Sequence, residues 1–295
     1  MIPFEYRTPR TLDQALAHLR EFGEDARPLA GGTALVLMMR QRLIRPACLV
    51  NIRGVAGLDR IEHANGTVEI GACATHRDVE TSALVRARLP VLADTYHHVG
   101  TIRIRNVATV GGGLAHADPN QDAPVTLLAL GARVRVRGPQ GERQVALDDF
   151  FTDYYQTSLA AGELVAGVSV PVLGPRTGAA FLKFLPRTAD DYGTVTAAAS
   201  VTLDAAGERC EAARIALGCV GTTPVRAAAA EDLLRGQRLT DDLLRAAGDA
   251  ANGGLDPIGD HRGSAAYKRE MAAVFLGRAV RAAWARARAS AADTR

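Results

Sequence analysis

The chain has 295 residues, of which 47% are hydrophobic, so it is long enough to bury the core of one large domain or two modest ones. Its 35 Lys and Arg residues nearly balance its 32 Asp and Glu residues, and a formal charge of +3 predicts no nucleic-acid partner. The sequence contains neither a signal-peptide pattern nor an apolar run of about 20 residues, which predicts a cytoplasmic protein without a membrane span.

The four cysteines, Cys48, Cys73, Cys210 and Cys219, stand far apart in the sequence. Zinc and iron–sulfur sites usually use closely spaced cysteine pairs, which this sequence lacks. We therefore expect reduced, mostly buried thiols and no metal site in this chain.

Residues 1–56 carry the pattern of a small βαβ lobe. Thr11, with Gln14 three positions later, is typical of a helix start, and Gly23 suits the end of the same helix. The elements expected next are a strand at 26–29, a helix at 34–42 and a strand at 49–52.

Residues 57–176 indicate a mixed α/β lobe with an antiparallel sheet. Two alternating apolar runs flank Asn65-Gly66, which is the strongest short signal for a β-hairpin. Further strands are expected at 134–137 and 164–170, and helices at 78–84, 91–99 and 124–130. Pro171, Gly174, Pro175 and Gly178 then crowd into a segment that we interpret as a linker.

Residues 177–287 predict a domain with a small antiparallel sheet and a helical bundle. Strands are expected at 195–203 and 212–218 with a turn at Ala206-Gly207, and helices are expected from Arg226, Thr240 and Ser264. We expect residues 288–295 to form a frayed tail. The predicted fold class is therefore α+β, with a two-part domain at 1–176 followed by the domain at 177–287.

The first segment that indicates chemistry is Ala30-Gly31-Gly32-Thr33-Ala34, between a predicted strand and a predicted helix. Glycine allows backbone amides to approach a ligand closely, and a helix N-terminus favours an anion such as a pyrophosphate. A simple turn before a helix would have the same sequence, so this segment alone does not define a function.

The second segment is Thr109-Val110-Gly111-Gly112-Gly113, which is followed by 117–122. Three consecutive glycines form backbone that can lie flat against a planar group, and the nearby carboxylate of Asp122 could accept hydrogen bonds from sugar hydroxyls. The alternative is a flexible loop in which Asp122 caps the helix that starts near Pro124.

Together, in this order and at this spacing, the two glycine segments resemble those of the FAD-binding (medium) subunits of the xanthine dehydrogenase and carbon monoxide dehydrogenase type. Three further segments carry the same resemblance: Gly71-Ala72-Cys73-Ala74-Thr75-His76, Ile104-Arg105-Asn106, and Pro257 to Gly263 with Tyr267. The resemblance covers nearly the whole chain. It implies that residues 1–176 form an FAD-binding domain in two parts, 1–56 and 57–176.

The resemblance also implies a role for each site residue. The backbone of 30–34 would hold the FAD pyrophosphate, and 109–113 would lie along the flavin. Asp122 would bind the adenosine ribose, and Lys183 would point at the pyrimidine edge of the isoalloxazine, where a cation stabilises negative charge. Tyr192 would cover one face of the flavin.

Other interpretations of the same side chains stay open at this point. Strand alternation would place Lys183 on the solvent side, and Tyr192 could be a core ring with its hydroxyl at the surface. His97, His98 and His116 have no cysteine or carboxylate at ligand spacing, so we interpret them as structural.

Two positions depart from the family pattern. Gly113 replaces an Asn, which removes an amide hydrogen bond, and Ala34 replaces a common polar residue. FAD binding would be somewhat weaker if those side chains contribute, although backbone donors would still hold the phosphates. The cysteine insertion that gives some aromatic acyl-CoA reductase relatives an extra iron–sulfur cluster is missing.

By resemblance, the chain is an oxidoreductase subunit that binds FAD non-covalently and needs partners. A large subunit would carry the molybdenum cofactor and a small subunit two 2Fe-2S clusters, from which electrons would pass through FAD to an external acceptor. We expect no catalytic acid, base or nucleophile in this chain. A dimer of heterotrimers is the assembly typical of the family. Two alternatives stay open, namely a stand-alone FAD-dependent oxidase and a flavin-free scaffold subunit.

Overall fold

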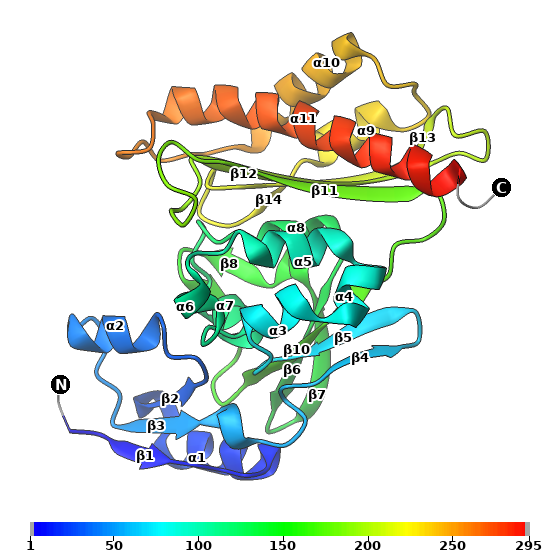
Figure 1. Cartoon of the computed structure of the whole chain (residues 1–295). Coiled ribbons are helices and arrows are strands. Elements are labelled where there is room, and N and C mark those ends of the chain that lie inside the picture. Colours follow the sequence, from blue (N-terminus) through cyan, green and yellow to red (C-terminus); the bar gives the residue numbers. More distant parts are fainter. Residues whose placement is uncertain (1–2, 293–295) are drawn as a thin grey trace.

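The computed structural model describes residues 3–292. Within that range, no helix has both the length and the apolar character needed to cross a membrane. Figure 1 shows an N-terminal lobe, a middle lobe and a C-terminal domain stacked along the molecule. Helices and mainly antiparallel sheets are combined throughout, which confirms the predicted α+β class.

The N-terminal lobe is a three-stranded parallel sheet in the order β1-β3-β2, packed against a helix. Its elements are β1 Glu5–Arg7, α1 Leu12–Phe22, β2 Ala26–Leu29, α2 Leu35–Arg40 and β3 Cys48–Asn51. Thr11 caps α1 by accepting from the Gln14 amide at 3.2 Å, while the Gln14 side chain accepts from the Arg10 amide at 2.8 Å. The helix start was therefore predicted, but the short strand β1 was not.

The middle lobe is a five-stranded antiparallel sheet, in the order β4-β5-β10-β6-β7, covered by helices. Its strands are β4 Ile61–Ala64, β5 Thr67–Gly71, β6 Arg133–Gly138, β7 Gly141–Ala146, β8 Phe151–Asp153, β9 Gln156–Thr157 and β10 Leu164–Pro171, of which β8 and β9 form a separate hairpin. Its helices are α3 His76–Thr81, α4 Ala83–Arg88, α5 Pro90–His97, α6 Ile102–Arg105, α7 Val110–His116 and α8 Ala123–Ala129. Asn65 and Gly66 have φ values of 51° and 77°, as a tight turn between β4 and β5 requires, which confirms the hairpin.

Strand β10 contributes to two hydrophobic cores because its alternate side chains point to opposite faces and a bulge between Val165 and Gly167 reverses the alternation for the residues that follow. Val165, Val168 and Val170 lie in the core of the middle lobe. Leu164 and Ala166 lie in the core of the N-terminal lobe. The strand therefore joins the two parts of the predicted FAD-binding domain.

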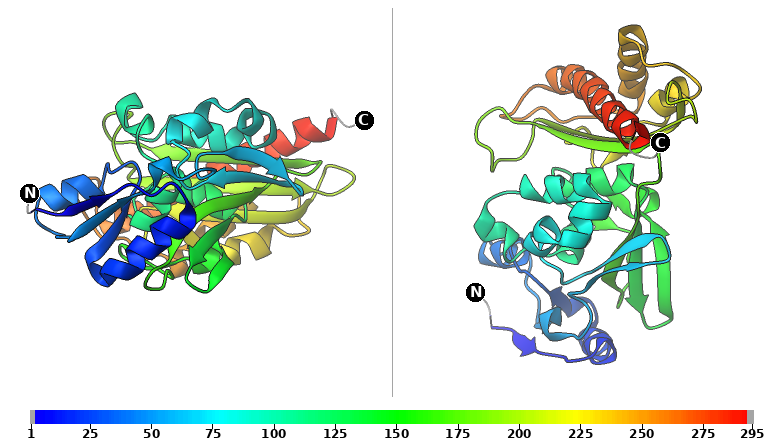
Figure 2. Two further views of the ribbon diagram at one scale, coloured as in Figure 1. Left: turned by 90° about the horizontal axis from the view of Figure 1, so that it is seen from below. Right: turned by 45° about the vertical axis from the view of Figure 1, so that its right-hand side comes forward.

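The C-terminal domain is a four-stranded antiparallel sheet in the order β11-β12-β13-β14. Its elements are β11 Thr177–Phe184, β12 Val195–Leu203, β13 Cys210–Gly218, β14 Val225–Arg226, α9 Ala228–Leu234, α10 Asp241–Ala251 and α11 Ala265–Ala292. Helix α11 crosses one face of the sheet, and α5 and α8 of the middle lobe lie under the other face (Figure 2).

For this region the expected linker is shorter than predicted, and the expectation of a frayed tail is wrong. Pro171 and Gly178 lie within β10 and β11, so only 172–176 connects the two strands. At Gly178 an added Cβ would lie 2.2 Å from the backbone oxygen of Ala283, so the glycine serves close helix packing rather than a linker. The helix α11 continues to Ala292, so the predicted tail is helical as far as that residue, and 293–295 lie outside the described residues.

Candidate functional site

The first glycine segment, Ala30 to Ala34, is an open loop between β2 and α2. Gly32 has a φ of 72°, a conformation that favours glycine. Among the described residues, no protein acceptor is found for the backbone amides of 31–35, whereas the Val36 amide bonds to the Gly32 carbonyl at 3.0 Å. A run of unpaired amides at a helix start is a set of donors suited to an anion.

The second glycine segment forms the helix α7 rather than a flat or flexible loop. Thr109 caps this helix by accepting from the Gly112 amide at 3.2 Å. The Val110 and Gly111 amides donate to the carbonyls of Ala74 and Ala72 at 3.0 and 2.9 Å. The expectation of a loop was wrong because these tertiary bonds outweigh the low helix propensity of glycine. The exposed side of α7 carries only small groups at Gly112 and Ala115.

The fold brings the two glycine segments together. An added Cβ on Gly31 would lie 2.2 Å from the Val107 carbonyl oxygen, so the first loop rests directly on the chain that leads into α7. Behind α7, an added Cβ on Gly111 would lie 2.4 Å from Cβ of Ala72. Gly31 thus allows the first loop to pack against 107–108, and Gly111 allows α7 to pack against Ala72.

The Ile104-Arg105-Asn106 motif is held by a buried carboxylate that the sequence analysis missed. Arg105 Nε lies 2.9 Å from Glu80 Oε2, and its Nη1 donates to the carbonyls of Val99 and Gly100. Burial alone would raise the pKa of Glu80, but hydrogen bonds from His97 and two arginines outweigh it and lower the pKa to about 2. Arg105 thus fixes the turn that precedes the second glycine segment.

Lys183 and Asp122 form a buried ion pair between the C-terminal domain and the middle lobe. Lys183 Nζ lies 2.8 Å from Asp122 Oδ2 and donates to the His98 carbonyl at 3.1 Å. The two side chains are only 3% and 4% exposed, so the solvent-facing interpretation of Lys183 is wrong. Burial raises the pKa of Asp122 to about 6 although Lys183 opposes this shift.

This contact bears on the two roles predicted for Asp122 and Lys183. The adenosine ribose and the isoalloxazine pyrimidine edge lie at opposite ends of an extended FAD, whereas Lys183 and Asp122 touch. Asp122 Oδ2 is bonded to Lys183, whereas Asp122 Oδ1 is buried without a hydrogen-bond partner among the described residues. Lys183 still has a third N–H donor beyond the two in use.

Tyr192 is not a core ring, because 41% of the residue is exposed. Its hydroxyl donates to Asp118 Oδ2 at 2.9 Å, just beyond the end of α7. The Arg262 guanidinium carbon lies 5.5 Å from the centre of its ring. The structure therefore joins Tyr192 to the second glycine segment and to the 257–263 segment, a connection that sequence spacing did not reveal.

Further aromatic and histidine side chains surround α7. Tyr155, 53% exposed at the β8–β9 turn, packs against His116 with ring centres 5.1 Å apart. His76 lies buried behind the helix, and burial lowers its pKa to about 4, so it is neutral at pH 7. His97 bonds to Glu80 and His98 to a backbone carbonyl, which agrees with structural roles.

At Gly113, where the family pattern has an Asn, a neighbouring side chain occupies the space beside the glycine. Gln121 Nε2 donates to the Gly113 carbonyl at 3.0 Å, and an added Cβ at Gly113 would lie 2.8 Å from Gln121 Oε1. An amide group therefore stands beside the position where the family pattern has an Asn. Ala34 contributes no side-chain cap to α2.

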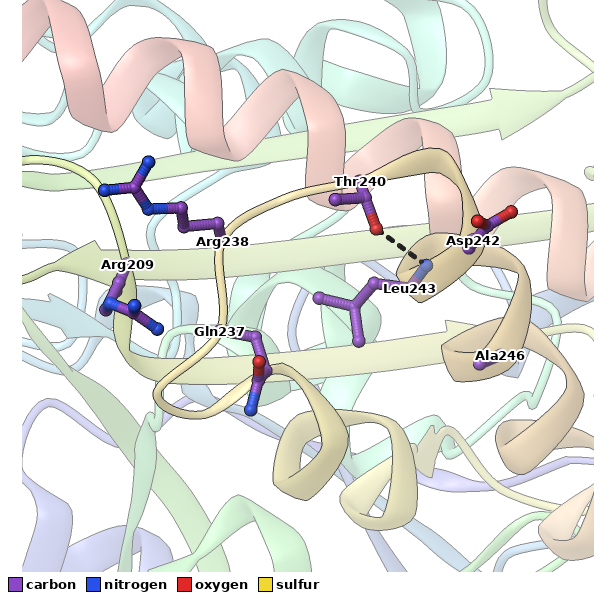
Figure 3. Close-up of a pocket in the computed structure, with 7 residues that line it drawn as sticks. All are labelled: Arg209, Gln237, Arg238, Thr240, Asp242, Leu243 and Ala246. Atoms are coloured by element: carbon purple, nitrogen blue, oxygen red, sulfur yellow. Dashed lines mark hydrogen bonds between the residues drawn. The ribbon is translucent and has the colours of Figure 1, made fainter.

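A pocket of about 510 Å³ lies in the C-terminal domain, away from these residues (Figure 3). Its lining residues are Arg209, Gln237, Arg238, Thr240, Asp242, Leu243 and Ala246. Thr240 caps α10, and both arginines already have partners in Gly236 and Glu208. The pocket shares no residue with the site described above.

Two family models match consecutive parts of the chain. Residues 2–173 match the FAD binding domain in molybdopterin dehydrogenase, and residues 180–283 match the carbon monoxide dehydrogenase flavoprotein C-terminal domain. The chain is thus a flavoprotein of the molybdopterin dehydrogenase class.

Relatives match over almost their whole length. The carbon monoxide dehydrogenase medium chain of Hydrogenophaga pseudoflava is 37% identical, with 97% of this chain and 99% of the relative covered. The 6-hydroxypseudooxynicotine dehydrogenase complex subunit alpha of Paenarthrobacter nicotinovorans is 38% identical, with 97% and 96% covered.

Two solved structures give the same result. A chain in carbon monoxide dehydrogenase from Hydrogenophaga pseudoflava superposes with a TM-score of 0.93 at 39% identity, covering 97% of this chain and 99% of the other. A chain in quinoline 2-oxidoreductase from Pseudomonas putida 86 gives 0.90 at 34% identity, covering 97% and 98%. The protein belongs to the FAD-binding medium subunits of the xanthine dehydrogenase and carbon monoxide dehydrogenase family. It is therefore an oxidoreductase subunit, and these comparisons favour neither a stand-alone oxidase nor a flavin-free scaffold.

Proposed function

We propose that the loop of 30–34 holds the diphosphate of one FAD and that the flavin lies along the exposed side of α7. The observation that carries this proposal is the run of unpaired amides at 31–35, set against the chain leading into α7. The match to an FAD-binding domain supports FAD as the cofactor, and the small residues Gly112 and Ala115 leave room for a planar ring. Bound FAD would supply the redox chemistry, taking electrons from iron–sulfur clusters and passing them to an external acceptor.

The contacts of Asp122, Lys183 and Tyr192 suggest a role for each of them. Asp122 holds Lys183 in place instead of binding a ribose, and the third N–H of Lys183 serves the pyrimidine edge of the flavin. Tyr192 lies over one flavin face, beside α7. None of these side chains acts as an acid, base or nucleophile.

The complete assembly would contain three kinds of subunit. A large subunit binds the molybdenum cofactor and oxidises the substrate, and a small subunit carries two 2Fe-2S clusters. Two such heterotrimers would form a dimer, as the resemblance to the family implies; the relatives' names, a medium chain and a complex subunit, support a multi-subunit assembly. The expected cytoplasmic location stays a prediction.

The phosphate-binding role can be tested by Gly32→Val. The branched side chain would occupy the amide loop and strain a backbone with a φ of 72°. Gly57→Val is the matched control, because Gly57 has a φ of 83° with nothing near an added Cβ. We expect the flavin-to-protein absorbance ratio of the purified complex to fall at least five-fold in Gly32→Val only. Equal flavin content in both variants would refute the assignment.

A further inference from the structure

The loop 185–194, between β11 and β12, is tied at Tyr192 to two distant parts of the chain. The Tyr192 hydroxyl donates to Asp118 Oδ2 at 2.9 Å, and the residues are 74 positions apart in the sequence. Asp118 is 7% exposed and also accepts from the Asn120 amide at 2.9 Å. The acceptor that holds the tyrosine is therefore itself fixed.

The other tie comes from Arg262. Its guanidinium carbon lies 5.5 Å from the ring centre of Tyr192, and its Nη2 lies 3.0 Å from Asp191 Oδ1. The same Asp191 oxygen accepts from the Tyr192 amide at 2.8 Å, so one arginine contacts both the ring and the backbone turn that carries it.

Arg262 is in turn held by its own loop. Asp260 Oδ1 accepts from the Arg262 amide at 2.8 Å, and Asp260 Oδ2 lies 2.9 Å from Nζ of the buried Lys268. The Arg262 carbonyl accepts from the Thr194 hydroxyl at 3.2 Å, at the far end of the tyrosine loop. The hydroxyl of Tyr192 thus contacts Asp118 and its ring contacts Arg262, and both of these residues are held by other bonds.

We propose that Asp118 and Arg262 are positioning residues that hold the Tyr192 ring beside α7, at the flavin face. We call Tyr192, Asp118 and Arg262 the tyrosine clamp. The clamp joins the segment after α7 to the C-terminal domain, so it fixes the ring relative to both. Its role toward the flavin rests on the proposed function, whereas its effect on the loop does not.

The first measurement is independent of flavin. Arg187 is exposed in the tyrosine loop, so the rate of trypsin cleavage after it, in the purified full complex, reports loop opening. We expect Arg262→Met, Asp118→Ala and Tyr192→Phe to be cut at least three-fold faster than the parent. Asp118→Asn should stay near the parent rate, because its amide oxygen can still accept from the Asn120 amide while its NH₂ group donates to the Tyr192 hydroxyl oxygen. Equal rates in all variants would overturn the clamp.

The matched control is Arg278→Met in the same domain. The Arg278 guanidinium carbon lies 5.0 Å from the ring centre of Phe275, so this variant also removes an arginine–aromatic contact, but on α11. We expect parent-like cleavage after Arg187. Faster cleavage in this control as well would show a general loosening of the domain and would count against the clamp.

The second measurement tests the flavin face. A tyrosine beside a flavin quenches its fluorescence, so Tyr192→Leu should raise the emission per bound FAD at least three-fold. Arg262→Met should give part of that rise alone and none when added to Tyr192→Leu. A further rise in the double variant, or no rise in Tyr192→Leu, would overturn the positioning role. A complex without flavin absorbance would instead refute the proposed function, and the trypsin rates would still decide the clamp.

Discussion

The ion pair between Asp122 and Lys183 predicts a specific pattern of stability in a double-mutant cycle. At 2.8 Å and an effective dielectric constant of about 20, the attraction is about 6 kcal/mol. Removing two charges from water costs several kcal/mol for each ion, which offsets most of that attraction. The ion pair should therefore add little net stability, whereas removing one partner should destabilise the fold because the other charge is left buried and unpaired.

We expect Asp122→Asn and Lys183→Met each to lower the free energy of unfolding by about 3–5 kcal/mol at pH 8. The double variant should lie within about 2 kcal/mol of the parent, because it loses both the attraction and the desolvation cost. Urea unfolding of the FAD-free chain, followed by circular dichroism, measures all four proteins. Additive losses in the double variant would refute the argument.

The pH dependence separates the two single variants. The pKa of Asp122 is raised from 3.8 to about 6, so the folded state takes up a proton in this window, and stability from this group falls as pH rises through about 6. In Lys183→Met the unpaired Asp122 carboxylate can become neutral by taking up a proton. The loss of unfolding free energy relative to the parent should therefore be smaller at pH 5 than at pH 8. The corresponding loss in Asp122→Asn should not shrink, because this variant has no carboxyl group at position 122 to take up a proton. Equal behaviour of both variants would contradict the pairing.

Three further predictions concern the support of the site. The pKa of His76 is lowered from 6.5 to about 4, so the parent should lose about 3 kcal/mol from this group as pH falls through that window, and urea unfolding of His76→Gln should show a correspondingly smaller loss. Arg105→Lys keeps the charge but not the forked guanidinium, so it should lower the free energy of unfolding by about 1–3 kcal/mol. A loss below about 0.5 kcal/mol, which is typical of a surface substitution, would contradict its anchoring role. Acid should release all flavin from the complex, since burial raises the pKa of every cysteine thiol, and flavin retained on the denatured chain would disprove a non-covalent site.

The sequence predicted the elements whose signals are local. Asn65-Gly66 specifies a hairpin turn because both residues tolerate a positive φ, and the strand at 195–203 has the bounds expected from its apolar run. Strand β7 was missed because its residues are mostly exposed and polar, which leaves no alternating pattern to detect.

The site contacts could not be predicted in the same way, because they depend on the tertiary fold. Three glycines disfavour a helix in isolation, and α7 forms only with the Thr109 cap and the carbonyls of Ala72 and Ala74. Asp122 and Lys183 are 61 positions apart, and no local pattern indicates that they meet. The family resemblance suggested these residues, whereas the geometry shows which of them are in contact.

The position of β10 has a consequence for the order in which the chain matures during synthesis. It is the last of the five strands of its sheet to be translated, yet it lies in the middle, between β5 and β6. The cores of the N-terminal lobe and the middle lobe both include residues of β10, so neither is complete until residue 171 has left the ribosome. Until then the nascent chain exposes unpaired strand edges and apolar faces. The N-terminal and middle lobes should consequently mature as one late cooperative unit, and a stalled chain ending before Leu164 would be a substrate for chaperones and proteases rather than an independent lobe.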